Sequence, residues 1–454
     1  MSRTAITTRP TYPDVEDLPR PPGMLHLAFT LAVLVGINTM NFFDRQILSA
    51  VQEKIRAEWH LSDSELGWLG TAFILLYAVV GLPLGRLADV WRRKWVLAAG
   101  VGLWSVLTAG SGLAWDFASL FALRLGVGVG EASCAPAASS LIGDLVGAKW
   151  RARAMSLFML GLPVGLALSY LVSTTVAKEF GWKSAFFVAG VPGLALAVAA
   201  LFLAEPRRGG VASPGGGLPF LSVVHTVLSL PTMWWIIASG ALLNFNMYAL
   251  GSFQTSFFMR YHGIEITQAG RISALVSGVG ALGLFAGGWL GDLAFRRGVS
   301  GRLHVAWLGS AAAIPCLLLA LAVPRGQAWS CAAWLLPASV LLYTYYGTVY
   351  ATIQDIIEPG LRGTAMAIYF CAMYVFAVFG PVATGWLSDY CARWEALGEP
   401  VADLHKALGL HDAMHLIPVL EAALVVVLFA ASRTVAGDHR RLRKRMQAAA
   451  GDGE

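Results

Sequence analysis

Long apolar stretches recur along the chain, and each is about as long as a helix that crosses a lipid bilayer. An α-helix rises 1.5 Å per residue, so about 20 apolar residues cross the roughly 30 Å of bilayer hydrocarbon. Hydrophobic residues make up 57% of the sequence and charged residues only 13%, which exceeds what the core of a water-soluble domain accommodates. The sequence therefore predicts an all-α membrane protein.

The pattern of apolar blocks predicts twelve transmembrane helices. They cover residues 25–51, 66–90, 95–114, 117–146, 153–178, 183–204, 232–260, 269–295, 303–323, 329–357, 362–391 and 413–436. The segment 205–231 contains Pro206, Pro214 and several glycines, which is typical of a linker. We therefore expect an N-terminal tail at 1–24, helix bundles at 25–204 and 232–436, a linker at 205–231 and a basic tail at 437–454. Part of the linker, 218–230, is expected to lie on the membrane surface.

Most lysines and arginines fall in the segments that share a side with the two chain ends. Positive charge favours the cytoplasmic side, so this distribution predicts a multi-pass inner-membrane protein with both termini in the cytoplasm. The net charge of +6 comes from short clusters between apolar blocks, which does not indicate a nucleic-acid surface. We expect a monomer surrounded by membrane lipids.

No catalytic or cofactor motif emerges from the sequence. It shows no His/Glu metal spacing, no Gly-x-Ser-x-Gly elbow and no phosphate loop. The five cysteines have no paired spacing, so we expect them to be small packing residues. The triplet Gly126-x-Gly128-x-Gly130 lies within an apolar span, so it predicts close helix contacts instead of dinucleotide binding. We therefore expect a non-enzymatic protein with no cofactor and no metal ion.

The ends of the second and eighth spans repeat one pattern. Gly85 and Asp89 precede the basic pair Arg92 and Arg93, and the same order of residue types returns later in the chain. Its second copy consists of Gly288, Asp292, Arg296 and Arg297. This repetition indicates two similar halves.

The first copy resembles the loop motif of major facilitator superfamily carriers. The resemblance implies a major facilitator fold, with two pseudo-symmetric six-helix bundles that alternate between two conformations. It further implies that Gly85, Asp89, Arg92, Arg93, Gly288 and Asp292 act in gating. The plainer interpretation of the basic residues alone is an ordinary cytoplasmic loop.

Two further stretches resemble the Spinster-type branch of that superfamily. They are Asn41-Phe42-Phe43-Asp44-Arg45 in the first span and the run from Arg124 to Ser133 in the fourth. The resemblance implies a secondary active carrier of an amphiphilic substrate, such as a lysolipid or a sphingoid phosphate. Organic-anion carriers of the superfamily share the Asp-Arg pair, so a proton-coupled carrier of small organic anions is the alternative.

Four charged residues lie within the spans of the first half: Asp44, Arg45, Arg124 and Glu131. An ionised group in a membrane span costs about 2.5–3.5 kcal/mol, so such groups are paired, hydrated or functional. Arg124 and Glu131 are two helical turns apart and share a face. We predict that Asp44 pairs with Arg124 and Arg45 with Glu131. Glu131 and Asp44 would couple protons while the arginines bind an anionic substrate. A fixed ion-pair network between the helices is the alternative.

The second half offers polar and aromatic candidates for the substrate site. They are Asn244, Gln254, Tyr345, Tyr346, Tyr369 and Tyr374. Clustered tyrosines suit an amphiphilic cavity, although packing explains any single ring. Pro163 in the fifth span and Pro381 in the eleventh interrupt helical hydrogen bonding, so we expect bends there that serve gating.

Overall fold

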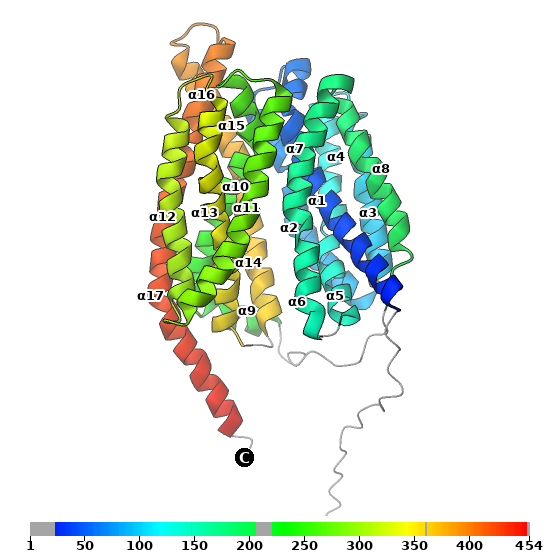
Figure 1. Cartoon of the computed structure of the whole chain (residues 1–454), viewed down its shortest axis with the longest axis vertical. Helices are drawn as coiled ribbons and strands as arrows, with labels where there is room; N and C mark the ends of the chain where they lie inside the picture. Colours follow the sequence, from blue (N-terminus) through cyan, green and yellow to red (C-terminus); the bar gives the residue numbers. More distant parts are fainter. Residues whose placement is uncertain (1–22, 147, 206–219, 359–360, 452–454) are drawn as a thin grey trace, which may run out of the picture.

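The structure is a computed structural model that describes residues 23–146, 148–205, 220–358 and 361–451 (Figure 1). All regular elements in these residues are helices, which confirms the all-α prediction. Helices of the first half are α1 (Met24–Trp59), α2 (Asp63–Val90), α3 (Arg93–Ser111), α4 (Phe117–Glu131), α5 (Cys134–Leu145), α6 (Ala148–Met159), α7 (Gly161–Phe180) and α8 (Trp182–Ala200).

The second half has the same helical character. Its helices are α9 (Phe220–Leu228), α10 (Pro231–Arg260), α11 (Ile266–Phe295), α12 (Gly301–Leu321), α13 (Ala328–Ile356), α14 (Arg362–Ala377), α15 (Phe379–Glu395), α16 (Asp403–Met414) and α17 (Leu416–Gly451). Within the described residues, ten helical segments are long and apolar enough to cross a membrane. The other two predicted spans, 95–114 and 329–357, correspond to α3 and α13.

Three predicted spans are not continuous helices: the fourth, fifth and eleventh are divided as α4/α5, α6/α7 and α14/α15. The break in the fourth span corrects the expectation, and a fourth break, between α16 and α17, lies at the start of the twelfth span. Each interruption lies three residues before a proline: Pro136, Pro163, Pro381 and Pro418. A proline lacks the backbone N–H that would bond four residues back, so the preceding turn is weakened. Bends were predicted only at Pro163 and Pro381.

Side chains from neighbouring helices satisfy carbonyl groups at two of these interruptions. Asn38 Nδ2 donates to the Phe158 carbonyl oxygen at 2.7 Å, next to the break before α7. Thr71 Oγ1 donates to the Val378 carbonyl oxygen at 2.8 Å, at the break between α14 and α15. A freed carbonyl in a membrane span needs such a partner because lipid offers none.

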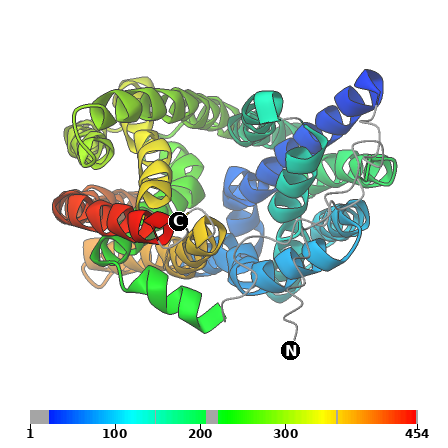
Figure 2. The ribbon, with the colours of Figure 1, turned by 90° about the horizontal axis from the view of Figure 1, so that it is seen from below.

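The helices pack as two bundles, α1–α8 and α10–α17 (Figure 2). In the first, α3 packs on α8, α1 on α7 and α2 on α4; in the second, α13 packs on α11 and α12, and α10 on α14 and α17. The bundles meet through α7 with α11, α2 with α15 and α1 with α10. Most of the predicted linker, residues 206–219, lies outside the described residues.

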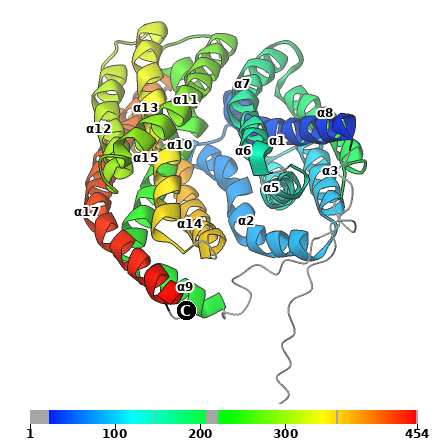
Figure 3. The ribbon, with the colours of Figure 1, turned by 60° about the horizontal axis from the view of Figure 1, so that its bottom comes forward.

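We call the end that carries the start of α1 and the end of α17 the terminal end, and the opposite end the distal end (Figures 1 and 3). The bundles approach closely where the first turns of α2 meet α15. A Cβ atom on Gly67 would lie 2.5 Å from the Pro381 carbonyl oxygen, and one on Gly385 would lie 2.1 Å from that of Asp63. Glycine is therefore required on both helices for this contact.

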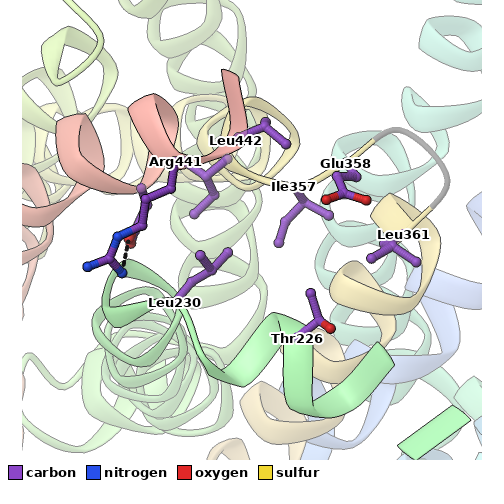
Figure 4. Close-up of a pocket in the computed structure, with 9 residues that line it drawn as sticks. Thr226, Leu230, Ile357, Glu358, Leu361, Arg441 and Leu442 are labelled. Atoms are coloured by element: carbon purple, nitrogen blue, oxygen red, sulfur yellow. Dashed lines mark hydrogen bonds and ion pairs between the residues drawn. The ribbon is translucent and has the colours of Figure 1, made fainter. Parts of the chain in front are cut away.

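Helix α9 and the extension of α17 lie at the terminal end, where α17 continues as a helix well beyond the predicted span. Together with the end of α13 they surround a mostly apolar groove (Figure 4). Its lining residues are Thr226, Leu230, Ile356, Ile357, Glu358, Leu361, Asp438, Arg441 and Leu442. Helix α9 therefore packs on the second bundle; its place on a membrane surface stays a prediction.

Candidate coupling and substrate site

The buried charges of the first bundle form two ion pairs. Arg124 on α4 places Nη1 3.3 Å from Asp44 Oδ1 on α1, and its Nη2 donates to the Asp44 carbonyl oxygen at 3.2 Å. The hydroxyl of Thr108 on α3 donates to the other carboxylate oxygen of Asp44. Asp44 is therefore held by groups from two other helices, and both members of the pair are buried.

The second ion pair joins Arg45 to Glu131. Arg45 Nε lies 2.8 Å from Glu131 Oε2, and the two side chains are 7% and 0% exposed. Glu131 is the last residue of α4, beside the break before Pro136. Its second oxygen, Oε1, has no hydrogen-bond partner among the described residues. Both predicted pairings are confirmed, and each pair keeps one buried atom without a partner among the described residues: Oε1 of Glu131 and Nε of Arg124.

Aromatic rings surround the Arg45 guanidinium. Its carbon Cζ lies 5.0 Å from the ring centre of Phe42, 5.5 Å from Phe73 and 4.8 Å from Tyr77. Such ring faces attract a cation and partly replace its hydration. The Tyr77 ring in turn lies 5.1 Å from that of Tyr374 on α14. The site therefore borders the second bundle, and Tyr374 is the predicted tyrosine that comes nearest to the charges.

Other residues predicted for the substrate site lie inside the second bundle. The Tyr345 hydroxyl is 2.7 Å from Ser239 Oγ and 3.1 Å from the Tyr369 hydroxyl, and both tyrosines are fully buried. Tyr346 donates to Asn244 Oδ1 at 3.3 Å. Their roles with a substrate stay predictions, because these contacts are equally those of a packed core.

Gln254 stands further from the predicted site. Its side chain lines an apolar pocket that Phe257, Leu317 and Met414 also line, within the second bundle. Asn244 and Gln254 lie on one helix, but ten residues separate them by about 15 Å of helical rise, so a shared site was not to be expected. Tyr77, Phe73 and Thr108 were missed; Phe73 and Tyr77 are spaced one turn apart, which is the signal that marks them as one aromatic face.

At the distal end, Arg260 on α10 bridges the bundles. Its guanidinium lies 2.6 Å from Glu53 Oε1 on α1 and 2.7 Å from a carboxylate oxygen of Asp63 at the start of α2. All three side chains are less than a tenth exposed. Ser388 Oγ on α15 also donates to Asp63 at 2.6 Å. We call Glu53, Asp63 and Arg260 the distal lock.

The comparisons with known proteins agree with this architecture. The family model described as Major Facilitator Superfamily matches residues 34–396. The chain belongs to the major facilitator superfamily. Proteins of this superfamily are transporters and not enzymes.

The chain is similar to several members of this superfamily. An MFS-type efflux pump of Mycolicibacterium smegmatis (strain ATCC 700084 / mc(2)155) is 28% identical, over 85% of this chain and 90% of the relative. Protein spinster homolog 1 of Mus musculus is 28% identical over 96% of this chain and 86% of its own. A crystal structure of a bacterial homologue of the human lysosomal transporter Spinster, inward-facing and unoccupied, has a TM-score of 0.81 at 27% identity, covering 91% of this chain and 98% of that one. The predicted resemblance to the Spinster branch is confirmed.

Arg93, a residue of the loop motif, is held by two carboxylates. Arg93 Nη1 lies 2.5 Å from Asp144 Oδ2 on α5, and its Nε lies 3.3 Å from Glu205 Oε1. Glu205 also accepts the backbone N–H groups of Arg93 and Lys94 at the start of α3, where a carboxylate complements the helix dipole. Arg92 is exposed, and the surroundings of Gly85 and of the Asp89 side chain are not among the described parts of the structure.

The second copy of the motif uses a different arginine from the expected pair. Arg302 at the start of α12 lies 2.8 Å from Asp292 Oδ1 and forms a further ion pair with Asp355 at the end of α13. A Cβ atom on Gly288 would meet open space, so this glycine is not required for a close approach on that side. Gating roles for the motif, Pro163 and Pro381 stay predictions.

Proposed function

We propose that this carrier works by alternating access, is driven by protons and moves an amphiphile with an anionic head, of lysolipid or sphingoid-phosphate type. The observation that supports it most is the buried Arg45–Glu131 pair, which borders the second bundle and leaves one carboxylate oxygen without a partner. A guanidinium in such a place provides a bidentate fork for a phosphate or carboxylate group.

Proton binding and substrate binding compete for the same arginine. When Glu131 is ionised, its charge holds Arg45 at 2.8 Å; when Glu131 takes a proton, that attraction is lost and Arg45 is free for an anion. Asp44 is the second proton-coupling candidate, but it accepts hydrogen bonds from both Arg124 and Thr108. Glu131 is therefore the primary proton acceptor in this proposal, and Arg124 keeps Asp44 compensated.

The rings around Arg45 favour an amphiphile over a small anion. Phe42, Phe73 and Tyr77 surround the guanidinium, and Tyr374 contributes a ring from the second bundle. An apolar chain attached to the anionic head gains free energy by leaving water for such surfaces, whereas a small hydrophilic anion does not.

The proposal places the protein in the inner membrane as a monomer, with both termini in the cytoplasm. The bundles at 25–204 and 232–436 then rock about the site, joined by the linker at 205–231. The distal end faces outward in this orientation, and the lock there holds it closed. The conformation is therefore inward-facing, in line with the similarity to the inward-facing Spinster homologue.

Transport in proteoliposomes tests the proposal. Wild-type protein should accumulate a fluorescent lysophospholipid in response to a pH gradient, and Glu131→Gln should lose this response while still exchanging substrate. Glutamine keeps the shape and one acceptor oxygen but carries no titratable charge. Glu421→Gln is the matched control, because Glu421 is an equally buried carboxyl of the second bundle.

Two results would contradict separate parts of the proposal. An unchanged response to the pH gradient in Glu131→Gln would remove the coupling role. Accumulation of small organic anions such as sugar acids, with no transport of lysolipids or sphingoid phosphates, would replace the substrate class and leave the coupling scheme standing.

A further inference from the structure

Three potential metal ligands gather at the distal end, where α16 gives way to α17. His411 and Asp412 lie near the end of α16, and His415 is the residue between the two helices. One ligand atom of each lies within 4.8 Å of the others. His411 and Asp412 are partly buried, whereas His415 is exposed, so one side of the cluster faces water.

Hydrogen bonds to backbone carbonyls fix the tautomer of both histidines. His411 Nε2 is 3.0 Å from the carbonyl oxygen of Leu321 on α12, and His415 Nδ1 is 3.1 Å from the carbonyl oxygen of His411. A carbonyl oxygen only accepts, so each of these ring nitrogens carries a hydrogen. His411 Nδ1 and His415 Nε2 therefore present lone pairs. Metal-binding histidines are oriented in this manner by their other ring nitrogen.

The remaining contact in the cluster needs a positive charge. His411 Nδ1 lies 3.1 Å from Asp412 Oδ1. With the hydrogen on Nε2, both atoms are acceptors and repel each other unless a cation lies beside them or the ring takes a second proton. Tyr261 stacks on His411 with ring centres 4.3 Å apart, and the exposed Arg325 donates a hydrogen bond to the Tyr261 carbonyl oxygen.

The sequence carries a matching signal that the search for His/Glu spacing missed. In His411-Asp412-Ala413-Met414-His415 the histidines are four residues apart, which places them on one face of a helical turn. Helical zinc sites of the His-Glu-x-x-His type use this spacing of histidines, and there the glutamate that follows the first histidine acts as a general base. Here an aspartate occupies that position and lies close enough to both histidines to be a ligand itself.

We propose that His411, Asp412 and His415 bind a divalent transition-metal ion, with zinc the best match to two imidazoles and a carboxylate. Three protein ligands of this kind leave a position for water. The bound ion would fix the last turn of α16 to the residue that joins it to α17, beside the last residue of α12. This proposal is independent of the substrate and of proton coupling, and it replaces the expectation of a chain without a metal site.

Zinc binding to the full-length, tag-free protein in detergent tests the proposal. After its metal ions are removed with a chelator and zinc is added back, wild-type protein should retain one zinc per chain through desalting and melt at a higher temperature than the zinc-free protein. The double variant His411→Ala/His415→Ala should lose both effects. His405→Asn is the matched control, because His405 lies on the same helix outside the cluster, and its ring accepts a backbone hydrogen bond that asparagine can also accept.

A second, milder variant keeps the test decisive if the double variant folds poorly. Asp412→Asn preserves size and helix packing but lowers the charge of the ligand set, so its affinity for zinc should fall at least about tenfold. Cobalt added in place of zinc should give a visible absorption band in wild-type protein that Asp412→Asn weakens. Zinc retention equal in wild type and Asp412→Asn, or no zinc retained by wild type, would overturn the proposal; in the latter case the His411–Asp412 contact is a simple ion pair.

Discussion

The two bundles share an arrangement of helices but differ in what they bury. The centre of the first holds two ion pairs, Asp44 with Arg124 and Arg45 with Glu131. The second holds hydroxyl contacts among Ser239, Tyr345 and Tyr369, together with an amide-to-carboxyl bond from Asn246 Nδ2 to Glu421 Oε2 at 3.2 Å. Ion pairs respond to protons and anionic ligands, whereas neutral hydrogen bonds mainly fix geometry. In the proposed function, proton coupling therefore lies in the first bundle.

The terminal ends of the bundles are more alike. Arg93 pairs with Asp144 in the first, and Arg302 pairs with Asp355 in the second. In each, an arginine at the start of one helix holds an aspartate near the end of another. The repeated contact therefore lies at the terminal end, and the difference lies in the centre. Substitutions in the centres of the two bundles and at the contacts between them test this interpretation.

The largest expected effect is that of Arg124→Ala. It leaves Asp44 buried with Thr108 as the remaining side-chain partner, and breaking a buried pair from one side typically costs about 3–5 kcal/mol. Melting temperature and yield of folded protein after detergent extraction should both drop sharply. The matched change in the second bundle, Tyr345→Phe, removes only neutral hydrogen bonds and should cost about 1 kcal/mol.

The comparison fails if these two variants are equally stable. Arg124→Ala/Asp44→Asn should recover much of the loss, because no uncompensated charge then remains. A double variant as unstable as Arg124→Ala would mean that the guanidinium packs the helices and does not compensate Asp44.

Hydropathy and residue spacing were sufficient to predict the helices and the central charges. Arg45 and Arg124 stood out because charged side chains in an apolar span require partners, and the seven-residue step from Arg124 to Glu131 put both on one face of α4. Two oppositely charged residues on neighbouring helices then had few other partners. Spacing along one helix is local information, so the sequence carries it directly.

The helix breaks and the distal lock depend on contacts that sequence patterns do not encode. Pro83 and Pro192 lie within continuous helices, while Pro136 and Pro381 follow breaks. A break is stabilised where another helix offers a donor, as Thr71 does for Val378. Arg260 lies at the end of a predicted span, where a charged side chain can reach water and does not require a buried partner. Its partners Glu53 and Asp63 come from distant segments, and only the folded chain shows them together.

A smaller effect is expected when the link between the bundles is cut by Arg260→Ala. Glu53 and Asp63 would then lose their shared cation. Opening of the distal end hydrates both carboxylates, so the loss of stability is smaller than for a pair that stays buried. A cost of about 3 kcal/mol on the closed state would raise the open population roughly 100-fold. The readout is the labelling rate of a Ser252→Cys reporter, at the bundle interface, in a background without the native cysteines.

Lys178→Ala is the matched control for this experiment. Lys178 and Glu265 also join the bundles at the distal end, at 2.8 Å, but their side chains are 44% and 66% exposed. An exposed pair contributes about 0–1 kcal/mol, so the labelling rate should barely change. Equal rates for Arg260→Ala and wild type would show that the close backbone contacts at Gly67 and Gly385 hold this end closed without the lock.

The smallest expected effect is that of Glu421→Gln. This substitution also tests most directly whether proton coupling is confined to the first bundle. Glutamine offers a carbonyl oxygen for the bond from Asn246, so the hydrogen bond persists and stability should change by less than about 1 kcal/mol. Transport driven by a pH gradient should keep its wild-type rate, since no ion pair of the second bundle depends on this carboxyl. Uptake should be measured beside Glu131→Gln in liposomes of the same composition. If Glu421→Gln loses the pH response instead, protons bind in the second bundle, and the charges of the first serve to hold its helices together.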